Sequence, residues 1–187
     1  MRTLPFTERS WQIAAELLLH GGVVLLPTDT VYGVACHPDF PEALERIRVM
    51  KGRDRSKPFQ LLVSDLEKVQ QDGAIWTAKA EALARLWPGA LTLVLSTQKG
   101  HTEGYRIPDD EGVRQLLRLC GGILRCTSVN LSGEPPSVNA QEAAIALPTA
   151  DLLLDGGPAR LGVASTVVAV DSEGNSTVLR QGDLVVL

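Results

Sequence analysis

Apolar positions along the chain follow two spacings, one typical of helices and one typical of buried strands. Residues 8–20 place apolar side chains three or four positions apart and end at Gly21-Gly22, which predicts a helix with a C-terminal stop. Residues 23–26 form a continuous apolar run closed by Pro27, which predicts a buried strand. The polar segment 28–33 therefore begins where a strand ends, a common place for functional side chains.

The same two spacings predict the rest of an α/β chain. We expect helices at 41–50, 79–87, 111–120 and 141–146, and strands at 59–63, 91–95, 123–127, 152–154, 166–170 and 177–179. Arg106 is expected in a loop. Several strands follow one another near the C-terminus, so a mixed sheet is expected rather than a purely parallel one. A chain of 187 residues with 44% apolar composition suits one domain spanning 1–187.

Composition excludes several classes of function. The net charge of −4 and the 4% aromatic content disfavour a broad nucleic-acid-binding surface. Three cysteines without CxxC spacing predict buried, reduced thiols and neither a disulfide framework nor a zinc site. An N-terminus without a signal-peptide core, and the lack of any run of 18 apolar residues, predict a cytoplasmic protein with no membrane association.

A cluster of cations is the strongest candidate for chemistry. Six basic residues lie between Arg46 and Lys57 against one acid, Asp54. Lys51 and Arg53 can converge on one phosphate group and Lys57 on a neighbouring one. The alternative interpretation is a solvated basic face near a helix C-terminus, where cations are favoured in any case.

Short polar side chains form the second candidate element. Ser128 and Asn130 follow a predicted strand and offer a hydroxyl and an amide to phosphate or ribose oxygens. The sequence lacks both GxxxxGK[ST] and GxGxxG, so phosphate must be held by side chains. No GxSxG surrounds Ser128, which disfavours a serine hydrolase. Alone, this segment is as well explained as a structural turn.

Taken together, these motifs resemble the YrdC family over nearly the whole chain. The motifs that carry the resemblance are Pro27-Thr28-Asp29-Thr30-Val31-Tyr32-Gly33, Lys51-x-Arg53, Lys57-Pro58, Trp87-Pro88-Gly89 with Leu91-Thr92, Arg106-Ile107-Pro108, Thr127-Ser128-Val129-Asn130-Leu131-Ser132-Gly133, Ser165-Thr166-Val167 and Arg180-x-Gly182. The resemblance implies a twisted open sheet with flanking helices around a positively charged central cavity.

The resemblance also implies an activity, that of a nucleotidyltransferase forming threonylcarbamoyl-AMP. Threonine and bicarbonate would give N-carboxy-threonine, which attacks the α-phosphate of ATP with Mg²⁺ and releases pyrophosphate. The product would pass to downstream tRNA-modifying proteins, with at most weak tRNA contact. The alternatives are a nucleotide- or RNA-binding module, a paralogue without this synthase activity, and a carbamoyl-adenylate-forming domain.

Roles carry over from the family residue by residue. Lys51 and Arg53 are the expected catalytic cations, and the threonine carboxylate is expected at Arg106. The ATP-binding residues would be Lys51, Arg53, Lys57, Thr102, Ser128, Asn130 and Arg180, and the threonine-binding residues Thr30, Tyr32, Arg106, Cys126 and Ser165.

Each of these roles has a structural alternative. The sequence does not identify the residues that would bind a metal ion. Tyr32 would instead pack in the core, and Arg180 would pair with Asp183. Asp29 would either coordinate Mg²⁺ or orient Thr30. The chain departs from the usual family pattern at four positions: Asp54 replaces a proline, Cys126 a serine, Leu62 a pocket histidine of longer relatives, and Pro136 stands close to where many members carry a small hydroxyl.

Overall fold

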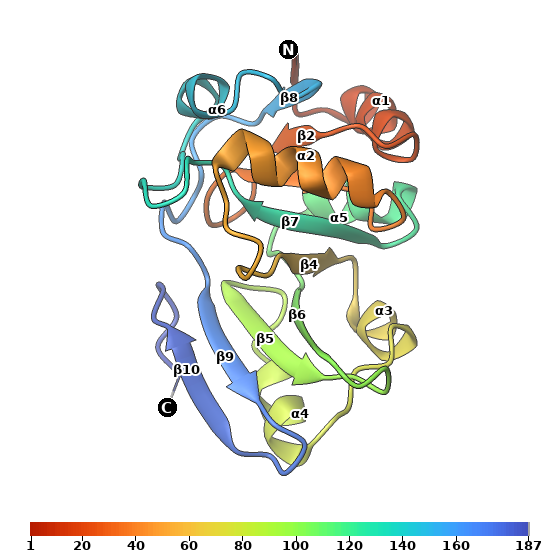
Figure 1. Cartoon of the computed structure of the whole chain (residues 1–187), viewed down its shortest axis with the longest axis vertical. Coiled ribbons are helices and arrows are strands. Elements are labelled where there is room, and N and C mark those ends of the chain that lie inside the picture. Colours follow the sequence, from red (N-terminus) through yellow and green to blue (C-terminus); the bar gives the residue numbers. More distant parts are fainter. Residues whose placement is uncertain (187) are drawn as a thin grey trace.

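The computed structural model describes residues 1–186, whose strands form one ten-stranded mixed sheet. The strand order is β1-β8-β2-β3-β7-β4-β6-β5-β9-β10 (Figure 1). The strands are β1 (Arg2–Pro5), β2 (Val24–Leu26), β3 (Gly33–Cys36), β4 (Gln60–Val63), β5 (Leu91–Ser96), β6 (Thr102–Arg106), β7 (Ile123–Ser128), β8 (Leu152–Asp155), β9 (Thr166–Val170) and β10 (Ser176–Arg180). The sheet contains both parallel and antiparallel pairs, which confirms the expected mixed sheet.

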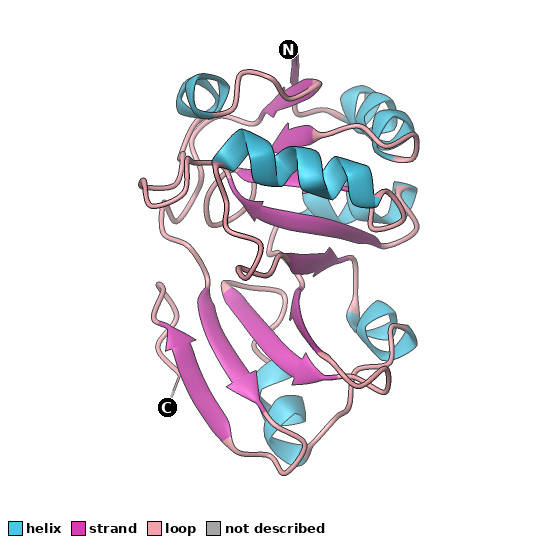
Figure 2. Ribbon diagram, viewed as in Figure 1, coloured by secondary structure: helices cyan, strands magenta, loops and turns pink. Residues whose placement is uncertain are grey.

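Helices flank both halves of this sheet. They are α1 (Glu8–Leu18), α2 (Pro41–Lys51), α3 (Leu66–Gln71), α4 (Ala78–Ala84), α5 (Glu111–Leu119) and α6 (Ala140–Ala146). Asp110 caps α5 by accepting from the Val113 N–H, and Gly52 ends α2 in the left-handed region at φ 58°. Figure 2 shows α1, α2, α5 and α6 around the strands of one half, and α3 and α4 beside those of the other.

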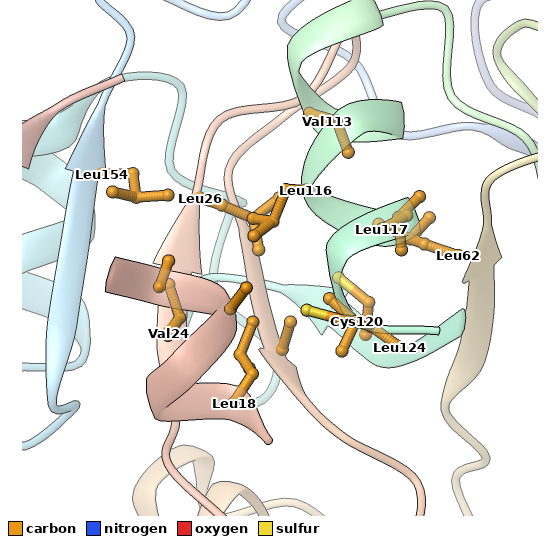
Figure 3. Close-up of a cluster of buried hydrophobic side chains, with 14 of the residues drawn as sticks. Leu18, Val24, Leu26, Leu62, Val113, Leu116, Leu117, Cys120, Leu124 and Leu154 are labelled. Carbon is orange, nitrogen blue, oxygen red and sulfur yellow. The ribbon is translucent and has the colours of Figure 1, made fainter. Parts of the chain in front are cut away.

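Side chains that alternate along the strands divide the core into separate layers. On β2, Val24 and Leu26 pack with α1 and α5, whereas Leu25 packs with α2 and α6. Figure 3 shows the first layer, in which Leu116 of α5 lies against Leu26 and Leu117 lies against Leu62 of β4. Helices therefore cover both faces of this half of the sheet.

The other half of the sheet is covered on one face only. Leu91, Leu93 and Leu95 of β5 pack with α3 and α4, together with alternate residues of β4, β6 and β9. The residues between them, Thr92 and Val94, line a cavity instead. The fold thus leaves one half-face of the sheet available for a ligand.

Several elements differ from the sequence-based expectation. The strands β1, β3 and β6 and the helix α3 were not predicted, and Arg106 ends β6 instead of lying in a loop. β6 reads Thr-Glu-Gly-Tyr-Arg and lacks an apolar pattern because its alternate residues line the cavity. The helix predicted at 79–87 ends at Ala84, since the last turn before Pro88 tightens into i→i−3 bonds.

Two further observations concern the described residues. No helix among residues 1–186 is both long and apolar enough to cross a bilayer. All three cysteines are buried and free, as predicted.

Candidate functional site

The uncovered half-face holds a cavity of about 310 Å³, within the range of roughly 300–1,000 Å³ typical of small-molecule sites. Nine of the twelve predicted site residues line it, namely Thr30, Arg53, Lys57, Thr102, Arg106, Cys126, Ser128, Ser165 and Arg180. The remaining three, Lys51, Tyr32 and Asn130, lie behind this lining. Thr30 and Arg180, which are 150 positions apart in the sequence, therefore line the same cavity, and several cations surround it.

Arg106 is the most deeply buried cation of the cavity wall, with 2% of its surface exposed. Its guanidinium pairs with Asp29 at 2.5 Å, donates to Thr30 Oγ1 at 2.7 Å and donates through Nε to the Gly89 carbonyl. Burial lowers the pKa of Arg106, and the Asp29 carboxylate opposes that shift. These bonds use three of the five guanidinium N–H groups, so two remain for a carboxylate ligand.

Asp29 orients Arg106, which neither sequence-based alternative anticipated. One carboxylate oxygen pairs with Arg106, and the other is buried without a hydrogen-bond partner among the described residues. Within those same residues, no group of three or more histidine, cysteine, aspartate or glutamate side chains can hold a metal ion. The described side chains therefore contain no cluster of that size near Asp29 or elsewhere.

Lys51 is a buried residue, with only 1% of its surface exposed, and does not line the cavity. Its ammonium group donates to the carbonyls of Ser128 and Asn130 and to Asn130 Oδ1, at 2.5, 2.6 and 3.0 Å. Burial, reinforced by the charge of Arg53, lowers the pKa of Lys51 to about 8. Lys51 thus fastens the end of α2 to the segment that follows β7.

Ser128 and Asn130 form the other side of this junction. Ser128 Oγ donates to Asn130 Oδ1 at 2.6 Å, and Asn130 Nδ2 donates to the carbonyls of Leu131 and Glu134. All polar atoms of the Asn130 side chain are therefore engaged in shaping the loop, whereas Ser128 itself reaches the cavity lining. The structure thus brings Ser128 and Asn130 together with Lys51.

Arg53 and Lys57 lie on the loop between α2 and β4. Arg53 donates to the Pro58 carbonyl at 2.9 Å, and its guanidinium carbon lies 5.2 Å from the centre of the Phe59 ring. Burial lowers the pKa of Arg53, with further lowering by the charges of Arg48 and Arg180. Lys57 is exposed at the cavity rim. These cations are placed to meet an anion that enters from solvent.

Arg180 enters the cavity from the last strand of the sheet. It donates to the carbonyl of Ser165 at 2.8 Å and to Ser165 Oγ at 3.2 Å, and the pair with Asp183 that was its structural alternative is not formed. Ser165 Oγ bonds to Thr92 Oγ1 at 2.8 Å, and Thr92 donates to Gln60 Oε1 at 2.7 Å. Gln60 and Thr92 were not predicted as site residues, and only their cavity-facing positions on β4 and β5 indicate a role.

Tyr32 and Cys126 were both predicted to bind threonine, and the structure places them differently. Tyr32 is fully buried, and its hydroxyl donates to the Gly157 carbonyl at 2.7 Å while accepting from the Gly156 N–H. Tyr32 therefore packs in the core and does not line the cavity. Cys126 is 2% exposed at the cavity floor, and burial raises the pKa of its thiol to about 12. A neutral thiol at this position offers packing and no charge.

Comparisons with known proteins extend these observations. The family model for Sua5, YciO and YrdC, described as "Telomere recombination", matches residues 16–182. The chain is 34% identical to the threonylcarbamoyl-AMP synthase of Bos taurus over 95% of this chain and 69% of that protein. It is 33% identical to the threonylcarbamoyl-AMP synthase of Chromohalobacter salexigens over 82% of this chain and 89% of that protein.

Solved structures show the same likeness. P. abyssi Sua5, solved in complex with L-threonine, matches with a TM-score of 0.89 at 31% identity, covering 98% of this chain and 57% of that one. E. coli YciO matches with a TM-score of 0.84 at 26% identity, covering 95% of this chain and 91% of that one. The chain thus spans little more than half the length of the Sua5 protein it resembles.

Proposed function

The chain belongs to the Sua5/YciO/YrdC family, and on that premise we propose that it is a threonylcarbamoyl-AMP synthase. The observation that carries the proposal is the buried Arg106, which keeps two free N–H groups at a cavity that is also lined by Arg53, Lys57 and Arg180. One site thus offers a fork for a carboxylate and separate cations for phosphates.

The reaction has two steps. The threonine amine attacks the carbon of bicarbonate, and loss of water leaves N-carboxy-threonine. An oxygen of the new carboxylate then attacks the α-phosphorus of ATP. The bond to the β-phosphate oxygen breaks, pyrophosphate leaves with the electron pair, and a mixed anhydride between the carbamate and AMP remains. No covalent bond to the protein is required at either step.

The protein contributes position and charge in this proposal. Arg106 holds the threonine carboxylate, and Thr30, which Arg106 and Thr28 both contact, lies beside it. Arg53 and Lys57 meet the phosphates and stabilise the charge that develops on the leaving pyrophosphate. Lys51 acts indirectly and does not contact the substrate. Its ammonium group binds the carbonyl of Ser128 and so fixes the segment that places Ser128 at the cavity.

Magnesium enters as part of the substrate. We propose that Mg²⁺ arrives bound to the ATP phosphates, since Mg²⁺ in nucleotide sites is usually held largely by phosphate oxygens and waters.

A second candidate is a paralogue of the same fold that uses another acyl donor or only binds nucleotide. The observation that favours it is the match to YciO, a chain of similar length that this chain covers almost completely. Both candidates share the cation-lined cavity and differ in the substrate that Arg106 would hold.

The experiment that separates them measures pyrophosphate release from Mg-ATP with threonine and bicarbonate added singly and together, with the product identified by mass spectrometry. The synthase requires both co-substrates and yields threonylcarbamoyl-AMP. If the protein binds nucleotide but forms no threonylcarbamoyl-AMP with threonine and bicarbonate both present, the chain belongs to the second candidate.

A further inference from the structure

Four side chains form a continuous hydrogen-bonded row across the cavity floor. Arg180 donates to Ser165 Oγ at 3.2 Å, Ser165 bonds to Thr92 at 2.8 Å, and Thr92 bonds to Gln60 Oε1 at 2.7 Å. Ser165 and Thr92 are each 2% exposed, whereas Gln60 is half-buried at the cavity wall. The row thus runs from a cation on β10 to an amide on β4.

The row has a fixed direction because a guanidinium can only donate. Ser165 accepts from Arg180, and the single Thr92 proton goes to Gln60, so Ser165 must be the donor to Thr92. Gln60 therefore accepts through Oε1, and its amide nitrogen keeps two N–H groups that donate to no residue among the 186 described. Each bond in such a row polarises the next, which strengthens the terminal donors.

Gly104 of β6 allows the row to form. Gln60 and Thr92 lie on strands either side of β6, and their side chains meet above Gly104. A Cβ built on Gly104 lies 3.7 Å from Gln60 Cβ and 3.6 Å from Thr92 Cγ2, so a methyl group fits there and a longer side chain meets the bridge. Gly104 also lines the cavity, which leaves the space beside the Gln60 amide to a ligand.

Gln60 lies between the two halves of the proposed substrate site. It directly follows the loop that carries Arg53 and Lys57, and Leu62, two residues further along β4, is the strand partner of Arg106. Residues two apart on a strand point to the same face, about 7 Å from each other. A group bound at Gln60 thus lies between an amino acid held at Arg106 and phosphates held by the loop.

We propose that the Gln60 side-chain amide binds the carboxylate oxygen that comes from bicarbonate, an inference that rests on the proposed synthase function. This carboxyl carbon must join the threonine amine to the α-phosphorus, and Gln60 occupies the intermediate position. The threonine carboxylate is the other planar carboxylate available, and the two free N–H groups of Arg106 suit it. Thr92 and Ser165 are positioning residues that aim the amide.

The test compares wild-type protein with Gln60→Glu and Gln60→Met. Glutamate keeps an acceptor for Thr92 but replaces the amide donor with a second acceptor, and methionine removes both. With pyrophosphate release as the readout, we expect the KM for bicarbonate to rise at least tenfold in Gln60→Glu and several-fold in Gln60→Met. The KM values for threonine and ATP should change by less than threefold.

Exposed Gln70 on α3 gives a matched control, because Gln70→Glu adds the same charge far from the cavity and should change no KM. An unchanged KM for bicarbonate in Gln60→Glu would overturn the inference, as would an equal rise for all three substrates. A rise confined to threonine would assign the amide to the amino-acid carboxylate instead, and so would also overturn it.

A binding measurement keeps this inference separate from the synthase proposal. Line broadening of ¹³C-labelled bicarbonate is recorded with wild-type protein and with Gln60→Glu, in the presence of threonine. If wild-type protein broadens the signal and the variant does not, Gln60 binds the anion even where wild-type protein forms no adenylate. Equal broadening by both proteins overturns the inference, whatever the activity of wild-type protein.

Discussion

At the scale of single residues, burial separates the cations that can meet a ligand from the one that supports them. Lys51 and Arg53 are two apart in the sequence and suggest one shared role. The structure turns Lys51 inward onto backbone carbonyls and leaves Arg53 at the cavity. Spacing predicted that both residues belong to the site, but it could not predict this division, because side-chain direction depends on how α2 packs against the sheet.

The buried position of Lys51 makes it a determinant of stability. We expect Lys51→Met to lower the free energy of unfolding by about 1–3 kcal/mol, because the carbonyls of Ser128 and Asn130 lose a buried donor. Urea denaturation measures the change. The matched control, Lys57→Met, removes an exposed cation and should stay within about 0.5 kcal/mol.

Lys51 also gives the stability a pH dependence with a definite sign. Its pKa of about 8 in the folded protein lies below its ordinary value of 10.5, so the unfolded chain binds more protons between these two pH values. The contribution of Lys51 to the free energy of unfolding therefore rises from pH 8 to 10.5 and is lost as the pH falls through 8. Denaturation at several pH values should show this rise in wild-type protein relative to Lys51→Met, and parallel curves would contradict it.

At the scale of elements, regular apolar spacing predicted most strands and helices that pack into the core, and it missed β6, whose cavity face is not apolar. β5 keeps leucine at alternate positions and was found, whereas β6 has polar or glycine residues on its cavity face and was not. β3 is four residues long and joins a polar turn, so its pattern is too short to detect. The missed elements are thus partly the ones that build the site.

The N-terminus of α5 offers a test at this scale. Asp110 accepts from the Val113 N–H, and α5 carries Leu116 and Leu117 into the core. We expect Asp110→Ala to cost about 1 kcal/mol of unfolding free energy, as loss of an N-cap usually does. Its neighbour Asp109 forms an exposed pair with Arg160, so Asp109→Ala should cost less than about 0.5 kcal/mol. Equal losses in thermal or urea denaturation would contradict the capping role.

At the scale of the whole molecule, the cavity collects residues from Thr30 to Arg180, so ligand binding and global folding should be linked. A ligand that binds only the folded state stabilises it by about 2.7 kcal/mol at a concentration of 100 Kd. We expect both threonine and Mg-ATP to raise the thermal midpoint of wild-type protein in a concentration-dependent way. Differential scanning fluorimetry measures the shift.

Arg106→Lys provides the discriminating variant for this measurement. Lysine keeps a charge for Asp29 but loses the two free N–H groups of the fork. The shift caused by threonine should be lost in Arg106→Lys, while the shift caused by Mg-ATP should remain. Loss of both shifts would indicate that the variant damages the cavity as a whole, and retention of both would contradict the carboxylate role of Arg106.

The one-sided covering of β5 and its neighbours also bears on how this protein can change. Odd-numbered positions 91, 93 and 95 keep the chain folded, and even-numbered positions 92 and 94 meet whatever enters the cavity. A combinatorial library restricted to the even positions would therefore explore new substrates while most of its members still fold. Natural divergence has the same freedom, which explains how one scaffold can diversify its chemistry without rebuilding its interior.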